Sequence, residues 1–85
     1  MKVEIRYFAS LREAVGLAGE SLELPPEVAT TGQLRRFLQA RGGVWQQALA
    51  DQCALRMALN HVVCDGDAKL TDSGEVAFFP PVTGG

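Results

Sequence analysis

The sequence has few cysteines, little net charge and no long apolar run. Its two cysteines, Cys53 and Cys64, are too few for a disulfide framework, and we interpret them as small buried thiols in a reducing compartment. Eight basic and ten acidic residues give a formal net charge of −2, which argues against nucleic-acid binding. No apolar run could cross a bilayer, and the alternating N-terminus is unlike a signal peptide. We therefore expect a cytoplasmic protein with no nucleic-acid or membrane partner.

Catalytic and ligand-binding motifs are also scarce. His61 is the only histidine, so a histidine dyad or a histidine-rich metal site is excluded. The four carboxylates within residues 65–75 do not have EF-hand spacing, and turn residues in solvent explain them better, so we expect no metal site. Neither G-x-x-x-x-G-K-[ST] nor G-x-G-x-x-G occurs, and we expect no cofactor bound by this chain alone.

What the sequence does contain is an ordinary globular balance, 47% hydrophobic and 21% charged, over 85 residues. This length suits one domain. Alternation of apolar and polar residues predicts strands. They span residues 2–8, 21–24, 55–60 and 75–79, with a further strand around 61–64.

Two capping boxes predict helices, because each pairs an N-cap hydroxyl with a Glu or Gln three residues later. Ser10 and Glu13 would open a short helix that Gly16 ends, and Thr30 and Gln33 would open the main helix, which Gly42 ends. A shorter helix is predicted within residues 44–51. We expect Arg35, Arg36 and Arg41 on the solvated side of the main helix.

This order of elements predicts an α+β fold, a single mixed sheet with one main helix packed on one face. The domain would span residues 1–79, and residues 80–85 would form an extended C-terminal tail. In a ubiquitin-like β-grasp fold the first and last strands are central neighbours. The pattern is compatible with that topology and does not force it.

The tail ends in two glycines and suits chemistry at its tip. Pro80 and Pro81 cannot continue a central strand and favour an extended exit from the sheet, which Val82 and Thr83 would continue. Glycines without side chains can enter a narrow slot. A terminal carboxylate attacking the α-phosphate of ATP would become an acyl adenylate. A sulfur donor could convert this to a thiocarboxylate, or a lysine amine could give an isopeptide bond, with catalysis supplied by a partner.

Two aromatic residues are predicted outside the core. Phe8 and Phe79 both lie on the strand faces opposite the core residues. If the first and last strands are neighbours, the two rings share one exposed patch. Exposed aromatic residues commonly anchor protein interfaces, so we expect this patch to bind a partner.

The segments VEIRYFASLREAVG (Val3–Gly16) and GEVAFFPPVTGG (Gly74–Gly85) resemble the small, sulfur-carrying subunit of molybdopterin synthase, within the ubiquitin-like sulfur-carrier family. The chain departs from this family at Leu59-Asn60-His61, where Val-Asn-Gln is more usual, and at its Asp72-Ser73-Gly74-Glu75 turn. The resemblance implies a β-grasp fold whose Gly85 is adenylated by an ATP-using activating enzyme. A sulfur donor protein then converts it to a thiocarboxylate.

The resemblance further implies a heterotetramer of two small and two large catalytic subunits. The tail would insert into the large subunit, where the thiocarboxylate would donate sulfur to cyclic pyranopterin monophosphate and build the dithiolene of molybdopterin. The large subunit would contribute the catalytic lysines, so the chain is not catalytic alone. Gly84 would give the tip its flexibility and fit. The residues expected to bind the partner are Phe8, Val63, Phe79, Pro80, Pro81, Val82 and Thr83.

Three other functions stay open at this point. The chain could be the related sulfur carrier of thiazole biosynthesis, whose tail also ends Gly-Gly, although Phe78–Pro81 favours the molybdopterin branch. It could be a protein modifier joined to lysines through Gly85, or an interaction module with an inert tail.

Overall fold

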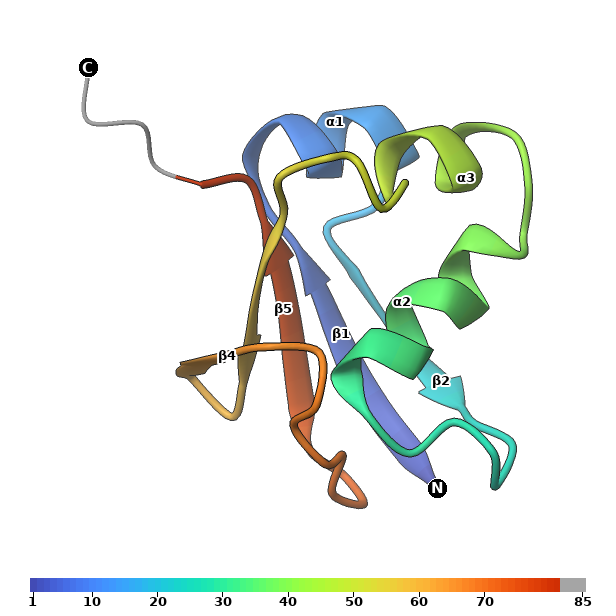
Figure 1. Ribbon diagram of the computed structural model, residues 1–85, viewed down its shortest axis with the longest axis vertical. Helices are drawn as coiled ribbons and strands as arrows, with labels where there is room; N and C mark the ends of the chain where they lie inside the picture. The colour runs from blue at the N-terminus through green and yellow to red at the C-terminus, as the bar shows by residue number, and fades with distance from the viewer. Residues whose placement is uncertain (82–85) are drawn as a thin grey trace.

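Five strands and three helices make up the computed structural model, which describes residues 1–81 (Figure 1). In chain order they are β1 (Lys2–Tyr7), α1 (Ala9–Val15), β2 (Gly19–Glu23), α2 (Thr31–Gln39), α3 (Val44–Ala48), β3 (Arg56–Leu59), β4 (Val62–Cys64) and β5 (Glu75–Phe79).

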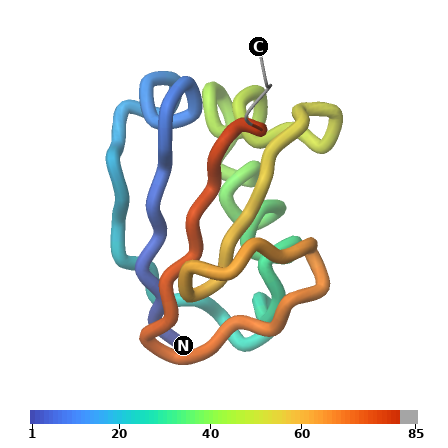
Figure 2. Tube along the Cα trace, turned by 90° about the vertical axis from the view of Figure 1, so that its left-hand side faces the viewer, coloured from blue at the N-terminus to red at the C-terminus, as the bar shows by residue number. Residues whose placement is uncertain are grey.

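The strands form one mixed sheet in the order β2-β1-β5-β3-β4 (Figure 2). Its two central strands, β1 and β5, run parallel, and every other pair is antiparallel. Helix α2 packs on one face of the sheet, and α1 and α3 lie at the end toward which β1 and β5 run (Figure 1). The predicted α+β fold with neighbouring first and last strands is confirmed.

The core lies between the sheet and α2 because alternate strand residues point to that face. Val3, Ile5 and Tyr7 of β1 are buried while the residues between them are exposed. Val76 and Phe78 of β5 are fully buried. The helical layer contributes Leu11, Leu34, Leu38 and Leu49.

One of the two predicted capping boxes is confirmed and the other is wrong. Thr30 Oγ1 accepts a hydrogen bond from the Gln33 backbone N–H at 3.2 Å, and Gln33 Oε1 accepts one from the Thr30 N–H at 3.1 Å. In α1, however, the N-cap is Phe8, whose side chain makes no capping hydrogen bond. Since the helix starts directly after β1, Ser10 already lies in its first turn and cannot cap it. Gly16 does end α1, at φ 76°.

The main helix also ends earlier than predicted. Its last residue is Gln39, and Gly42 and Gly43 lie in the connection to α3, with φ of 76° and 55°. Residues with a side chain rarely adopt this left-handed backbone conformation, so the two glycines allow the chain to reverse direction between α2 and α3.

The prediction that Arg35 lies on a solvated face is wrong. Its guanidinium donates hydrogen bonds from Nε to the Leu49 carbonyl oxygen at 2.9 Å and from Nη2 to those of Ala50 and Cys53, at 2.6 and 2.9 Å. These three carbonyl groups follow α3 and are not paired within a helix or a strand. Hydrogen bonds to them explain why the Arg35 side chain turns inward. Arg36 is exposed as predicted.

Arg41 is also less free than predicted, because it belongs to a polar network at the edge of the core. It forms a two-pronged ion pair with Glu20, at 2.9 Å for each N–O distance, and its guanidinium lies 4.4 Å from the centre of the Trp45 ring. The buried Tyr7 hydroxyl donates a 2.8 Å hydrogen bond to the same carboxylate. The hydrogen bond from Arg41, followed by that from Tyr7, lowers the pKa of Glu20 against the opposing effect of burial.

This network predicts acid-sensitive stability. Because the pKa of Glu20 is lower in the folded chain than in the unfolded one, its contribution is present above about pH 4.3 and is lost as the pH falls through the folded-state pKa. We expect Glu20→Gln to lower the melting temperature at pH 7 by about 4–8 °C, the shift given by about 1 kcal/mol in a domain of this size. The variant should then lose less stability than the unaltered chain between pH 6 and pH 3.

Thermal melts by circular dichroism test this expectation. The control is Glu23→Gln, which changes an exposed carboxylate on the same strand, paired only with the N-terminal amine at 3.5 Å. If the Glu20 and Glu23 variants lost equal melting temperature between pH 6 and pH 3, the acid-sensitive stability could not be assigned to Glu20.

Candidate functional site

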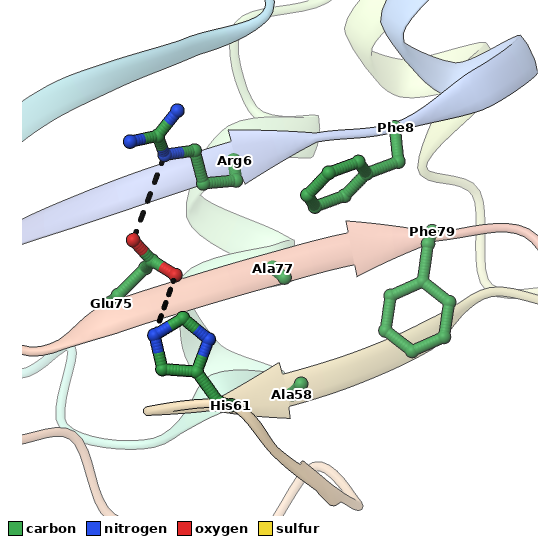
Figure 3. A pocket seen from close by; sticks show the side chains of 7 residues that line it. All are labelled: Arg6, Phe8, Ala58, His61, Glu75, Ala77 and Phe79. Atoms are coloured by element: carbon green, nitrogen blue, oxygen red, sulfur yellow. Dashed lines mark ion pairs between the residues drawn. The ribbon is translucent and has the colours of Figure 1, made fainter.

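A shallow hollow of about 520 Å³ lies on the face of the sheet opposite α2 (Figure 3). It is lined by residues of β1, β3 and β5, by the N-cap of α1 and by the β3–β4 turn: Arg6, Phe8, Ala58, His61, Glu75, Ala77 and Phe79.

Strand register explains the shape of the hollow. Arg6 is paired with Ala77 across the β1–β5 ladder, and Ala77 with Ala58 across the β5–β3 ladder. Directly paired residues point to the same face, so two small side chains form the floor. Phe8 and Phe79 each follow this row by two residues and stand at one end of it (Figure 3).

The structure therefore brings Phe8 and Phe79 together, as the alternation of β1 and β5 predicts. Phe8 is 47% exposed, and Phe79 is half-buried. Val63, at 62% exposed, pairs with Ala58 and so faces the same side, beside the hollow but outside its lining. That a partner binds to these residues remains a prediction.

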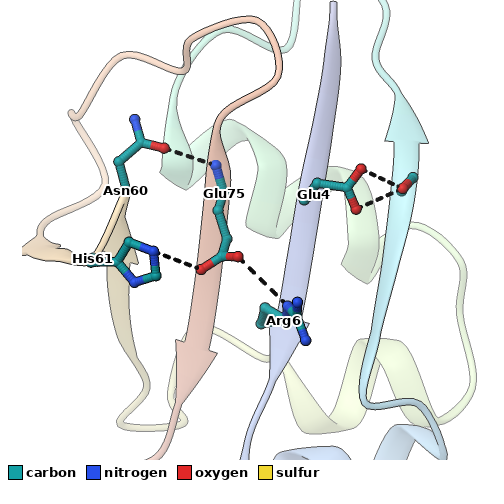
Figure 4. A network of polar contacts seen from close by, with 6 residues as sticks. Glu4, Arg6, Asn60, His61 and Glu75 are labelled. Carbon is teal, nitrogen blue, oxygen red and sulfur yellow. Dashed lines mark hydrogen bonds and ion pairs between the residues drawn. The ribbon is translucent and has the colours of Figure 1, made fainter.

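The other end of the hollow is polar, and sequence reasoning did not identify it as part of the site. Glu75 lies between Arg6 and His61, with Oε1 3.6 Å from Arg6 Nε and Oε2 3.5 Å from His61 Nε2 (Figure 4). Asn60 Oδ1 accepts a 2.9 Å hydrogen bond from the Glu75 backbone N–H. Because alternate residues of a strand share a face, the sequence could have placed Arg6 beside Phe8 and Glu75 on the face of Phe79. The turn that carries His61 has no such alternation to indicate where its side chain lies.

The chain leaves the sheet beside α1. Pro80 lines a mostly apolar crevice with residues of α1, α3 and the connection to β3, and Pro81 lies against Ala54, Leu55 and Arg56. Both prolines are half-buried. The remaining tail residues of the predicted site, Val82, Thr83, Gly84 and Gly85, lie outside the described residues.

Residues 1–81 contain no group of three or more His, Cys, Asp or Glu side chains that could hold a metal ion. Cys53 and Cys64 are free thiols and only half-buried, so their interpretation as buried side chains holds in part. Across these residues no helix is long and apolar enough to span a membrane.

Comparison with known proteins adds sequence and structural relatives. The model of the ThiS family matches residues 5–85. The chain is 40% identical to the molybdopterin synthase sulfur carrier subunit of Escherichia coli over 98% of this chain and 99% of that one. It is 32% identical, over the same shares, to the subunit of that name from Haemophilus influenzae. A structure of the complex of subunits 1 and 2 of molybdopterin-converting factor from Helicobacter pylori contains a similar chain, with a TM-score of 0.66 and 25% identity over the whole of both chains.

Proposed function

The chain belongs to the ThiS family, and on that premise we propose that it is the sulfur carrier subunit of a molybdopterin synthase. The observation that carries the proposal is the 40% identity to the Escherichia coli subunit, which extends over nearly the full length of both chains. The segment of this chain that the family model matches extends through Gly85.

The proposed chemistry takes place at the Gly85 carboxylate. It attacks the α-phosphorus of ATP in an activating enzyme, forming an acyl adenylate and releasing pyrophosphate. A donor protein then supplies sulfur, the carbon–sulfur bond forms as AMP leaves, and a thiocarboxylate results. Because the described residues have no phosphate-binding motif of their own, ATP and the catalytic groups come from the partners.

The second half of the cycle takes place on the large subunit. There the thiocarboxylate sulfur of Gly85 attacks cyclic pyranopterin monophosphate and forms a thioester that joins the chain to the pterin. Water then cleaves the bond between this sulfur and the Gly85 carbonyl carbon, which leaves the sulfur on the pterin and returns the chain to its carboxylate form. A dithiolene has two sulfur atoms and each chain carries one, so two carriers are consumed for each molybdopterin. A heterotetramer of two small and two large subunits accommodates this requirement.

The hollow gives the large subunit a surface to hold while the tail reaches the chemistry. Phe8 and Phe79 supply exposed aromatic area next to the point where the chain leaves β5, with Val63 beside them. Aromatic residues are the common anchors of protein interfaces. Pro80 and Pro81 follow directly after β5 and line crevices of the domain, and their rings restrict the backbone at the start of the tail.

The proposal predicts a thiocarboxylate on the purified chain after treatment with its activating enzyme, ATP and a sulfur donor. Intact mass spectrometry should then show a gain of about 16 Da, since one oxygen is replaced by sulfur. Omitting ATP is the control and should leave the mass unchanged. Higher-mass conjugates in place of this gain would indicate a protein modifier, and an unreacted chain would indicate an interaction module.

A further inference from the structure

The turn between β3 and β4 has two consecutive residues in an uncommon backbone conformation. Asn60 and His61 have φ of 51° and 71°, both in the left-handed region. A two-residue hairpin with two positive φ values usually has Gly at its second position, and Asn tolerates the first. Histidine at the second position therefore costs backbone strain, and such strain is concentrated where a side chain is needed.

The His61 side chain is not needed for packing. It is 83% exposed, and its contact with the described residues is the 3.5 Å pair with Glu75. Figure 3 shows His61 and Arg6 approaching the Glu75 carboxylate from opposite sides of the hollow. Glu75 thereby holds both side chains at the rim of the predicted docking face.

The unused hydrogen-bonding capacity at this rim consists of donors. Both Glu75 oxygens already face a nitrogen atom, of Arg6 or of His61, whereas Arg6 uses only Nε in its ion pair. Within residues 1–81 no hydrogen bond or ion pair occupies Arg6 Nη1 and Nη2. A guanidinium edge with two parallel N–H donors fits a carboxylate.

We propose that Arg6 and His61, positioned by Glu75, form a recognition site for one carboxylate side chain of the large subunit. This inference rests on the proposed function, because it names the chemistry of the partner at the same docking face. The carboxylate would lie beside the apolar end of the hollow, where Phe8 and Phe79 exclude water. Exclusion of water strengthens such a charge pair and makes the loss of either partner costly.

Charge at the rim predicts a pH dependence. The charged groups facing it are Arg6 and Glu4 from β1, Glu75 from β5 and Arg56 from β3, while β4 contributes none within Val62–Cys64. The Glu4 carboxylate accepts a 2.6 Å hydrogen bond from Ser21 (Figure 4). Histidine side chains gain a proton between about pH 8 and pH 5. Protonation of His61 would add one positive charge to this set of groups and so strengthen the attraction of a carboxylate.

The first test compares two arginine variants by calorimetry with the purified large subunit. We expect Arg6→Gln to weaken binding at least about tenfold, because it removes the guanidinium group but leaves the apolar part of the hollow intact. The matched control is Arg36→Gln, which removes the same charge from the exposed side of α2 on the opposite face, and should change the affinity less than about twofold. Equal effects of the two variants would overturn the proposal.

The second test is the pH dependence of binding affinity, which replacing a residue with a purely structural role would not change. Binding of the unaltered chain should be about fivefold tighter at pH 6 than at pH 8, and His61→Gln should remove this difference with little change at pH 8. An affinity that is independent of pH, or that falls on acidification, would overturn the role of His61.

A double-mutant cycle identifies the partner group. Each exposed Asp or Glu of the large subunit is replaced by its amide and tested against both Arg6 and Arg6→Gln. One of these replacements should weaken binding as much as Arg6→Gln does, and combining it with Arg6→Gln should weaken binding no further. Fully additive effects throughout would overturn the pairing, whereas failure of the unaltered chain to bind the large subunit at all would overturn the proposed function itself.

Discussion

Deletion of Gly85, or addition of one residue after it, is expected to abolish molybdopterin formation by the reconstituted synthase. The reason is geometric and chemical at once. The reacting carboxylate must lie at the tip of a tail that starts at a fixed point, where β5 ends at Phe79. Deletion moves the carboxylate back by one residue, about 3.3–3.6 Å of extended chain, and extension moves it forward by the same length. A misplacement of 1 Å already costs about 100-fold in some enzymes.

These tail variants should fold normally, because within residues 1–81 the buried core residues all precede Phe79. The matched control adds one glycine before Met1, which changes the length equally and should keep full activity. The assay measures molybdopterin formed from purified precursor, large subunit, activating enzyme, ATP and sulfur donor. Persistent synthesis by the deletion variant would contradict a role for the Gly85 carboxylate.

Replacement of Phe79 by aspartate is expected to abolish stable binding of the large subunit. Phe79 is half-buried in the free chain and lies at the aromatic end of the hollow, so the variant removes an aromatic anchor and binding would have to take a carboxylate out of water. We expect a loss of at least about 100-fold in affinity, or about 2.8 kcal/mol. The free domain should tolerate the change, since Arg56 pairs directly with position 79 across the β3–β5 ladder and can compensate the new charge.

The matched control for this variant is Val62→Asp. Val62 is 69% exposed and neighbours Val63 in β4, so its side chain points to the opposite face of the sheet. Calorimetry should show that the control binds within about threefold of the unaltered chain. Equal loss of affinity in both variants, or none in Phe79→Asp, would remove the hollow from the interface.

The parts of the fold that could be predicted from the sequence are those that local chemistry determines. Alternation in β1 and β5 placed Phe8 and Phe79 outside the core, and the Thr30–Gln33 pair predicted the start of α2. These features depend on residues within a few positions of one another. The aromatic end of the hollow followed once the two strands were assumed to be neighbours.

The parts that could not be predicted depend on contacts between distant segments. Arg35 turns inward to donate hydrogen bonds to three carbonyl oxygens that lie 14 to 18 residues later in the chain. Glu75 meets His61 only because β3 and β5 pair in one particular register. Periodicity within a segment has no information on either, so the polar end of the hollow emerged only from the fold.

The central claim is that Gly85 carries the sulfur that enters molybdopterin. The most direct measurement is a single turnover of thiocarboxylated chain with large subunit and cyclic pyranopterin monophosphate, followed by intact mass spectrometry of the chain and quantitation of the product. The account predicts that the chain loses its extra mass of about 16 Da at the rate at which molybdopterin appears, with two chains consumed for each product. Molybdopterin formed while the thiocarboxylate stays on the chain would contradict it.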